Sequence, residues 1–277
     1  MIKKNFAFLL ICLFFVAIIT SACGGGGKTT PPDNSAFYYL LAQQNANNNN
    51  EQEQQNEPTP DPSPTPDPSP VNPFADAKVG DYVEFGHYRQ TGDAENAAEW
   101  EPQPIEWQVL SIDAVNNRVL VISRYGLDRK CFDDNSNVWA GSEICSWLND
   151  DFYNTAFNET EKGFIKPVDI NFKNNGSDDY NFDGSTYNVF LLSEAEAENT
   201  AYFANAEARK CESTDYAKKH GAWVDNDNDN GYGAWWLRSP YPNYSDGVYY
   251  VDYGGNIHAT YVNDNRGVAR PALWINL

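Results

Sequence analysis

The residues best suited to bind a ligand lie near the C-terminus, in the 26 residues from Tyr241 to Arg266. Sixteen of these are Tyr, Asn, Asp, Ser, Thr or His. Tyrosine offers a rigid, amphipathic contact surface at low entropic cost, and the shorter polar side chains supply adaptable hydrogen bonds. The segment therefore predicts a binding surface. Polar loops between strands are the alternative that composition alone leaves open.

Motifs for catalysis or metal binding are scarce. The run from Asp225 to Gly231 alternates Asp and Asn, as calcium ligands do, but Asn230 and Trp236 occupy the positions where an EF-hand needs Gly and Glu. A looser calcium site and a solvated loop are both compatible with this run. The chain has no Gly-x-Ser-x-Gly elbow and no Cys/His spacing typical of zinc, and its three histidines are scattered. We therefore predict no enzyme, no metal site and no cofactor, although an acid pair for glycoside hydrolysis would be visible only in space.

Two apolar, aromatic blocks bracket the polar segment and predict the strands that position it. The first runs from Trp235 to Pro240 and the second from Arg270 to Leu277. Arg238 and Arg270 lie inside these blocks, so we expect both to be buried, paired and structural.

Further strands and helices are indicated upstream. A first strand is expected at 79–86, and a hairpin joins the alternating residues 105–109 to 119–122 through Asn116-Asn117. Apolar residues three or four apart predict a helix from about residue 144 to 157. Capping residues predict three more helices, which start at Asn158, at Ser193 and at Thr214 and end near residues 165, 203 and 220. With a loop at 171–187, this order predicts an α+β domain whose terminal strands share one sheet.

The first 72 residues predict a leader and a linker. Residues 1–22 have a basic start, an apolar run and small residues before Cys23, as signal peptides do. They resemble a bacterial lipoprotein signal, in which this cysteine receives lipid; cleavage elsewhere and an uncleaved membrane helix are the alternatives. Residues 23–72 are rich in Asn and Gln and then in alternating Pro, which predicts disorder followed by a polyproline spacer. Residues 73–277 are the expected globular domain.

Charge and cysteine content restrict the partners. A net charge of -20 repels phosphate backbones, so we expect no nucleic-acid partner. Once Cys12 and Cys23 are assigned to the leader and to lipid, three cysteines remain, which leaves open one disulfide with a free thiol or three buried thiols: Cys131, Cys145 and Cys211.

Five motifs run through the domain: Val-Gly-Asp-Tyr-Val-Glu-Phe-Gly at 79–86, Pro-Ile-Glu-Trp at 104–107, Trp-Leu-Asn at 147–149 with Ala-Phe at 156–157, Trp-Trp-Leu-Arg-Ser-Pro at 235–240, and Arg-Pro-Ala-Leu-Trp at 270–274. They resemble an uncharacterised family of exported bacterial domains related to the C-type-lectin-like fold, over almost all of 79–277. The resemblance implies paired N- and C-terminal strands, two flanking helices and a loop-rich ligand face. The calcium-site triplets of sugar-binding C-type lectins and the cysteine pair of formylglycine-generating enzymes are absent from the sequence.

Within that group, the polar segment is similar to the variable region of proteins diversified by retroelements. There, mutagenesis of adenines in Asn codons exchanges exposed residues while the framework stays fixed. The resemblance implies these ligand-binding positions: Tyr241, Asn243, Tyr244, Ser245, Tyr249, Asp252, Tyr253, Asn256, His258, Tyr261, Asn263 and Asn265. It also implies these framework residues: Trp235, Trp236, Arg238, Val262, Arg270 and Trp274.

Together these features predict a lipid-anchored protein, exposed on the surface of the cell envelope, that displays a Tyr/Asn-rich face. The expected partner is an unknown protein or glycan, and membrane attachment is expected through the lipid on Cys23. A fixed adhesive or structural envelope component is the alternative, and a degenerate enzyme is the third hypothesis.

Overall fold

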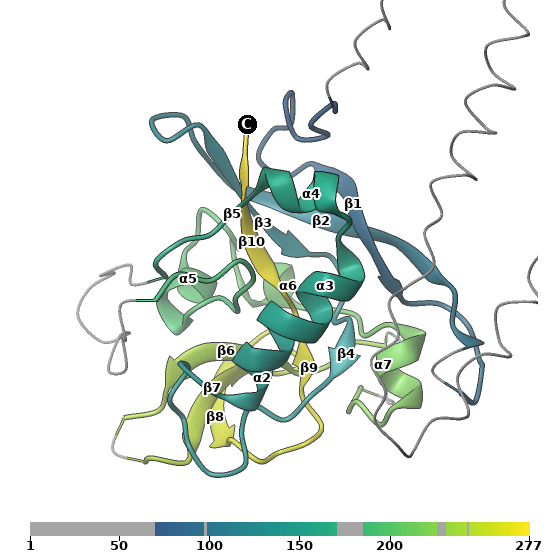
Figure 1. Ribbon diagram of the computed structural model, residues 1–277. Helices are drawn as coiled ribbons and strands as arrows, with labels where there is room; N and C mark the ends of the chain where they lie inside the picture. The colour runs from purple at the N-terminus through teal and green to yellow at the C-terminus, as the bar shows by residue number, and fades with distance from the viewer. Residues whose placement is uncertain (1–69, 97–98, 171–184, 226–230, 243) are drawn as a thin grey trace, which may run out of the picture. The chain divides into compact units, whose positions relative to one another are not determined.

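The computed structural model describes residues 70–96, 99–170, 185–225, 231–242 and 244–277 (Figure 1). The predicted signal peptide, Cys23 and the linker as far as residue 69 lie outside the described residues. So do Asn243, most of the loop predicted at 171–187, and residues 226–230 of the acidic run. In the described part of the chain, no helix is both long enough and apolar enough to cross a membrane.

Two five-stranded sheets with short helices make up the domain, which confirms the α+β class. The first sheet has the order β1 (Tyr82–Arg89), β2 (Pro102–Asp113), β3 (Arg118–Ser123), β10 (Ala272–Asn276) and β5 (Ile165–Lys166). The second has the order β4 (Asp128–Arg129), β9 (Val268–Ala269), β6 (Trp235–Pro240), β7 (Gly247–Val251) and β8 (Ile257–Tyr261). In Figure 1 the chain leaves the second sheet through β9 and enters the first sheet as the long yellow strand β10.

The first sheet contains the terminal strands, as predicted. The hairpin of β2 and β3 is also confirmed, with Asn117 in the left-handed region at its turn. However, β10 pairs with β3 and β5, so the direct pairing of terminal strands implied by the resemblance is not found. The first strand starts at Tyr82 and not at residue 79, because Gly80 has a φ of 94° and Asp81 N–H closes a turn onto the Lys78 carbonyl.

The helices begin where their capping residues predict. The stretch near 144–157 is helical as α2 (Glu143–Trp147), η2 (Leu148–Phe152) and α3 (Tyr153–Ala156), although the π-helical turn in its middle was not predicted. Asn158, Ser193 and Thr214 cap α4 (Glu159–Phe164), α5 (Glu194–Glu198) and α7 (Asp215–Lys219). The prediction that α5 reaches residue 203 is wrong: Asn199 is extended, and its side chain accepts a hydrogen bond from Ala201 N–H, which competes with the helix. A further short helix, α6 (Ala206–Arg209), was missed.

Buried tryptophans and arginines tie the sheets together. Trp235 and Trp236 are almost completely buried, and their indole N–H groups donate to the carbonyls of Arg209 and Lys130. Arg238 is buried and paired with Glu196, as expected. Arg270 is also buried, but it donates to backbone carbonyls and lies 4.9 Å over the Trp235 ring; in the described chain no carboxylate lies within 4.0 Å of it.

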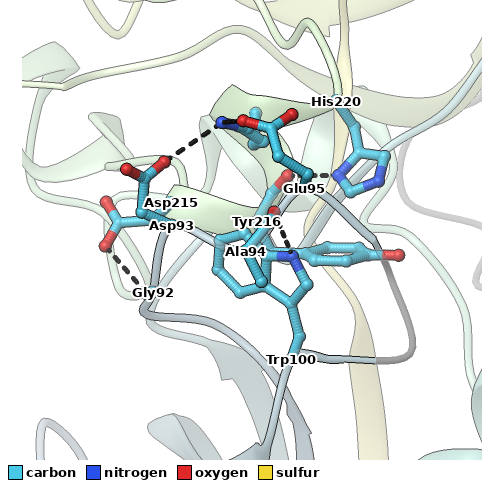
Figure 2. A network of polar contacts seen from close by, with 9 residues as sticks. Gly92, Asp93, Ala94, Glu95, Trp100, Asp215, Tyr216 and His220 are labelled. Carbon is cyan, nitrogen blue, oxygen red and sulfur yellow. Dashed lines mark hydrogen bonds and ion pairs between the residues drawn. The ribbon is translucent and has the colours of Figure 1, made fainter.

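Residues 92–95 and Trp100 pack on α7 (Figure 2). Trp100 is 4% exposed, and its indole N–H donates to the Ala94 carbonyl at 3.0 Å. Its ring meets the Tyr216 ring edge-on, with 5.2 Å between centroids. Above this contact, Lys219 bridges the carboxylates of Asp93 and Glu95. Apolar packing and an exposed ion-pair bridge therefore meet at one place.

Candidate functional site

The polar segment folds as the hairpin of β7 and β8 with its flanking turns, so much of the expected loop-rich face is strand. None of the predicted ligand-binding residues that the structure describes is buried. Tyr249 and Asp252 are half-buried, and the others are exposed: Tyr241, Tyr244, Ser245, Tyr253, Asn256, His258, Tyr261, Asn263 and Asn265. The buried positions of the segment are apolar or glycine: Gly247, Val248, Val251, Gly255 and Val262.

The strand register divides these side chains between two faces of the hairpin. Tyr249 pairs with Ala259, and Tyr250 pairs with His258. Because successive side chains of a strand point to opposite faces, Tyr249 and Tyr250 face opposite sides. The site therefore has two surfaces, one around Tyr249 and one around Tyr250.

Three rings form the first surface, which we call the tyrosine cluster: Tyr241, Tyr244 and Tyr249. Tyr241 stacks on Tyr244 with 5.7 Å between centroids and an interplanar angle of 26°, and it meets Tyr249 edge-on at 5.4 Å. Tyr244 is 60% exposed. Such offset and edge-on arrangements are the favourable geometries for aromatic rings, so the three rings stabilise one another.

A buried amide holds the turn that carries the tyrosine cluster. Asn137 donates through Nδ2 to the carbonyls of Tyr244 and Gly247, at 2.7 and 2.9 Å. Its backbone N–H also donates to the Ser245 carbonyl at 2.9 Å. Three carbonyls of the turn are therefore satisfied by one residue from a distant part of the chain.

The environment of Tyr249 favours a neutral phenol. Burial raises its pKa, and the charge and hydrogen bond of Glu194 raise it further, to about 12. Tyr249 is therefore uncharged at neutral pH and can both donate and accept a hydrogen bond.

The second surface contains a pocket of about 140 Å³, which we call the aromatic pocket. It is lined by Trp223, Ala234, Trp236, Tyr250, Thr260, Asp264, Arg266 and Gly267. The buried Trp236 ring lies against Gly267, where a Cβ would come within 2.5 Å of the indole. Glycine at this position therefore leaves room for the ring beside the pocket.

An ion pair lies at the polar side of the aromatic pocket. Arg266 Nη2 and Nε contact the two carboxylate oxygens of Asp264 at 2.7 and 3.0 Å, a bidentate arrangement. Hydrogen bonding from Arg266 lowers the pKa of Asp264, and the Thr260 hydroxyl lowers it further. Asp264 is therefore ionised at neutral pH, and its charge is balanced by Arg266.

Trp223 forms the exposed edge of the aromatic pocket. Its side chain is 39% exposed, and its ring meets that of Tyr253 at 4.6 Å. Its backbone N–H donates to the Arg266 carbonyl at 3.0 Å, which fixes it beside the ion pair. Exposed tryptophan next to exposed tyrosine is typical of a contact surface.

The comparison with protein families identifies the larger part of the chain. A family model described as "Domain of unknown function (DUF6273)" matches residues 116–277, more than half of the sequence. The chain belongs to this family. No curated protein and no solved structure matches it. The match starts in the turn between β2 and β3, so β1 and β2 precede the DUF6273 segment although they belong to the same sheet as β3.

The DUF6273 segment contains both surfaces and the motifs at 235–240 and 270–274. All six predicted framework residues are buried: Trp235, Trp236, Arg238, Val262, Arg270 and Trp274. Among the predicted ligand positions, Asp252 accepts from Asn256 N–H at 2.8 Å and lies 3.2 Å from His258 Nε2, so these three residues shape the β7–β8 turn. Asn263 and Asn265 contribute carbonyls to contacts with Cys131 and Arg129.

Several residues of the aromatic pocket were missed by the sequence analysis. Tyr250, Thr260, Asp264 and Arg266 lie inside the polar segment of the DUF6273 domain but were not selected, and Trp223 lies outside that segment. Strand alternation within the segment could have separated Tyr250 from Tyr249. No local signal connects Trp223 to this site.

No disulfide joins the three cysteines of the DUF6273 segment, all of which the structure describes, so the disulfide alternative is wrong. Cys145 and Cys211 are buried, whereas Cys131 is half-buried. Burial raises the pKa of both Cys211 and Cys131, which makes them poor nucleophiles. Within the described ranges, no three His, Cys, Asp or Glu side chains are placed to hold a metal ion.

A larger pocket of about 330 Å³ lies elsewhere on the domain, between β1, β2 and the start of α7. Its lining includes four carboxylates: Glu84, Glu106, Glu212 and Asp215. Arg124 pairs with Glu106, and Lys218 lies 3.6 Å from Asp215. The pocket contains none of the predicted ligand-binding residues.

Proposed function

We propose that this DUF6273 protein is a ligand-binding protein of the bacterial cell envelope, and that the tyrosine cluster and the aromatic pocket are its two ligand-contacting surfaces. One observation carries the proposal: the described ligand positions, all between residues 241 and 265, are exposed or half-buried, while the framework residues are all buried. Exposed tyrosines supported by a packed aromatic core are well suited to binding, because they lose little entropy on contact.

The scaffold is proposed to be C-type-lectin-like. Support comes from a sheet that contains both terminal strands and from a second sheet that carries the ligand hairpin. Exposed positions on such a hairpin can be exchanged without disturbing the core, which is the property that retroelement diversification requires. A reverse transcriptase gene beside a near-identical template repeat, differing only at adenines, is the genomic observation that tests this part of the proposal.

Attachment to the membrane is proposed to occur through lipid on Cys23. The sequence before Cys23 supports this, and the Pro-rich stretch that follows would hold the domain away from the membrane. Metabolic labelling with a lipid precursor should mark the wild-type chain and fail to mark Cys23→Ala. Equal labelling of both proteins would disprove the anchor.

The binding function is tested by probing the purified full chain against arrays of glycans and of extracellular proteins. Tyr244→Ser removes the most exposed ring of the tyrosine cluster and should weaken binding of the ligand about tenfold, the effect of losing a contact of roughly 1.4 kcal/mol. Tyr82→Ser is the matched control, because Tyr82 is 51% exposed but lies on β1. The proposal is contradicted if binding of the ligand is unchanged in Tyr244→Ser and Trp223→Ala but is lost in Tyr82→Ser.

A further inference from the structure

We propose that the aromatic pocket binds the ring of one uncharged pyranose sugar, so that the ligand of this protein is a glycan with a neutral hexose or N-acetylhexosamine residue. This inference rests on the proposed binding function and specifies its ligand class. It is carried by the size of the pocket, by its aromatic walls and by its balanced charge.

The volume of the aromatic pocket matches a single six-membered ring. The pocket measures about 140 Å³, and an engineered protein cavity of ~150 Å³ holds one benzene molecule. Drug-sized ligands need sites of ~300 Å³ or more. One ring therefore fits the pocket, and the rest of a larger ligand must extend outside it.

Aromatic faces form much of the wall. Trp236 and Tyr250 line the pocket with their rings 6.4 Å apart at 66°, and Trp223 lines its exposed edge. A pyranose has one face of C–H groups, which packs against an indole or a phenol while the hydroxyl groups stay at the ring edge. The exposed part of Trp223 would be covered by such a ring, which removes apolar surface from water.

The polar side of the pocket is electrically neutral. Asp264 and Arg266 are the charged residues among its lining, and they neutralise each other through two hydrogen bonds. A cationic or anionic ligand would have to compete with this pair. Sugar hydroxyl groups need not, because each can donate to a carboxylate oxygen and accept from a guanidinium N–H.

Two side-chain hydroxyl groups add further hydrogen-bonding capacity. Thr260 already bonds Asp264 and lies in the pocket lining, and Tyr250 contributes a phenol whose pKa is raised mainly by burial, so it remains neutral and able to donate. Hydrogen-bond donors and acceptors are thus both present in the lining of the aromatic pocket. This arrangement favours a ring with several adjacent hydroxyl groups over an aromatic side chain, which has at most one hydroxyl group to bond with them.

The test is saturation-transfer NMR on the purified full chain with single small molecules. The uncharged probes are the methyl pyranosides of glucose, galactose and mannose, together with N-acetylglucosamine. Glucuronate and glucosamine are the charged probes, and p-cresol represents a tyrosine side chain from a partner protein. At least one uncharged sugar should bind, with a dissociation constant in roughly the millimolar range expected for a ligand of this size.

Variants assign the signal to the pocket. Trp223→Ala should weaken sugar binding about tenfold, Trp223→Phe should restore part of it, and Asp264→Asn should also weaken it because the Arg266 pair is lost. Tyr82→Ala, an exposed ring on β1, should leave sugar binding unchanged. Urea unfolding curves show whether each variant folds. If Trp223→Ala does not fold, Trp223→Phe takes its place in the test and should bind the sugar more weakly than wild type.

Several outcomes overturn the inference. It fails if no uncharged sugar binds, if only p-cresol or a charged probe binds, or if sugar binding survives Trp223→Ala. In each case the broader binding function is judged separately, because an array ligand that is lost with Tyr244→Ser would still support a binding protein whose ligand is not a neutral sugar.

Discussion

Arg238 Nη1 lies 2.5 Å from Glu196 Oε2, and the two side chains are only 5% and 6% exposed. The same carboxylate oxygen accepts a hydrogen bond from Ser193 N–H at the start of α5. The guanidinium also donates to the carbonyls of Leu191 and Ile170. The N-terminal cap of α5 and Arg238 of β6 are therefore parts of one buried network, which attaches α5 to the sheet that carries the β7–β8 hairpin.

Arg238→Ala should destabilise the domain strongly. The substitution leaves the Glu196 carboxylate buried without its cation, which typically costs ~3–5 kcal/mol. Urea unfolding followed by tryptophan fluorescence measures the change. Lys162→Ala is the control: its partner Glu159 is 91% exposed, so a loss of less than ~1 kcal/mol is expected there. Equal losses in the two variants would show that the Arg238 network contributes little.

Local chemistry allowed much of the fold to be predicted. Asn158, Ser193 and Thr214 mark helix starts because their side chains accept from backbone N–H groups within the next turn. The two-residue strands β4, β5 and β9 were not predicted, since they are too short to show any periodicity and form only by pairing with distant strands. The order of strands in each sheet depends on the same non-local contacts.

The candidate site was predictable by residue type but not by arrangement. Exposure of Tyr244 and burial of Trp235 follow from the polar and apolar character of the two kinds of segment. Strand alternation separates Tyr249 from Tyr250, but which of the two faces the aromatic pocket depends on strand register, because a shift of one residue would exchange their faces. Trp223 reaches the pocket only through tertiary packing, so no local sequence pattern indicates its position there.

Asn137→Ala should loosen the turn that carries the tyrosine cluster. The substitution removes the side-chain donor to the Tyr244 and Gly247 carbonyls, and a buried unsatisfied group costs ~1–3 kcal/mol. Faster hydrogen exchange is expected at Tyr241, whose N–H donates to the Gly247 carbonyl. Asn135→Ala is the control at an exposed asparagine and should change neither stability nor exchange. Unchanged exchange at Tyr241 in Asn137→Ala would argue that the turn is held by other contacts.

Ionisation of Tyr249 should contribute to unfolding at high pH. Its pKa is raised from 10.0 to about 12, first by burial and then by Glu194, so the folded state holds this proton more tightly than the unfolded state. The resulting stability is fully present below pH 10.0 and is lost as the pH rises through about 12. Glu194→Gln should lower the pKa of Tyr249, measured by ¹³C NMR of tyrosine Cζ and assigned with Tyr249→Phe. Glu143→Gln, which removes an equal charge at an exposed position, controls for net charge; an identical shift in both variants would refute the role of Glu194.

Trp100, and not the Lys219 ion pairs, should hold residues 92–95 on α7. Lys219 bridges Asp93 and Glu95, but these carboxylate side chains are 92% and 81% exposed, so water and salt screen both pairs. Trp100 is 4% exposed and packs on Tyr216, and truncation of such a side chain costs ~3–5 kcal/mol. Trp100→Ala should therefore lower the urea midpoint of unfolding substantially. Neither Lys219→Ala nor added salt should change this midpoint measurably. The opposite order, with Lys219→Ala the more harmful change, would mean that charge and not burial positions this segment.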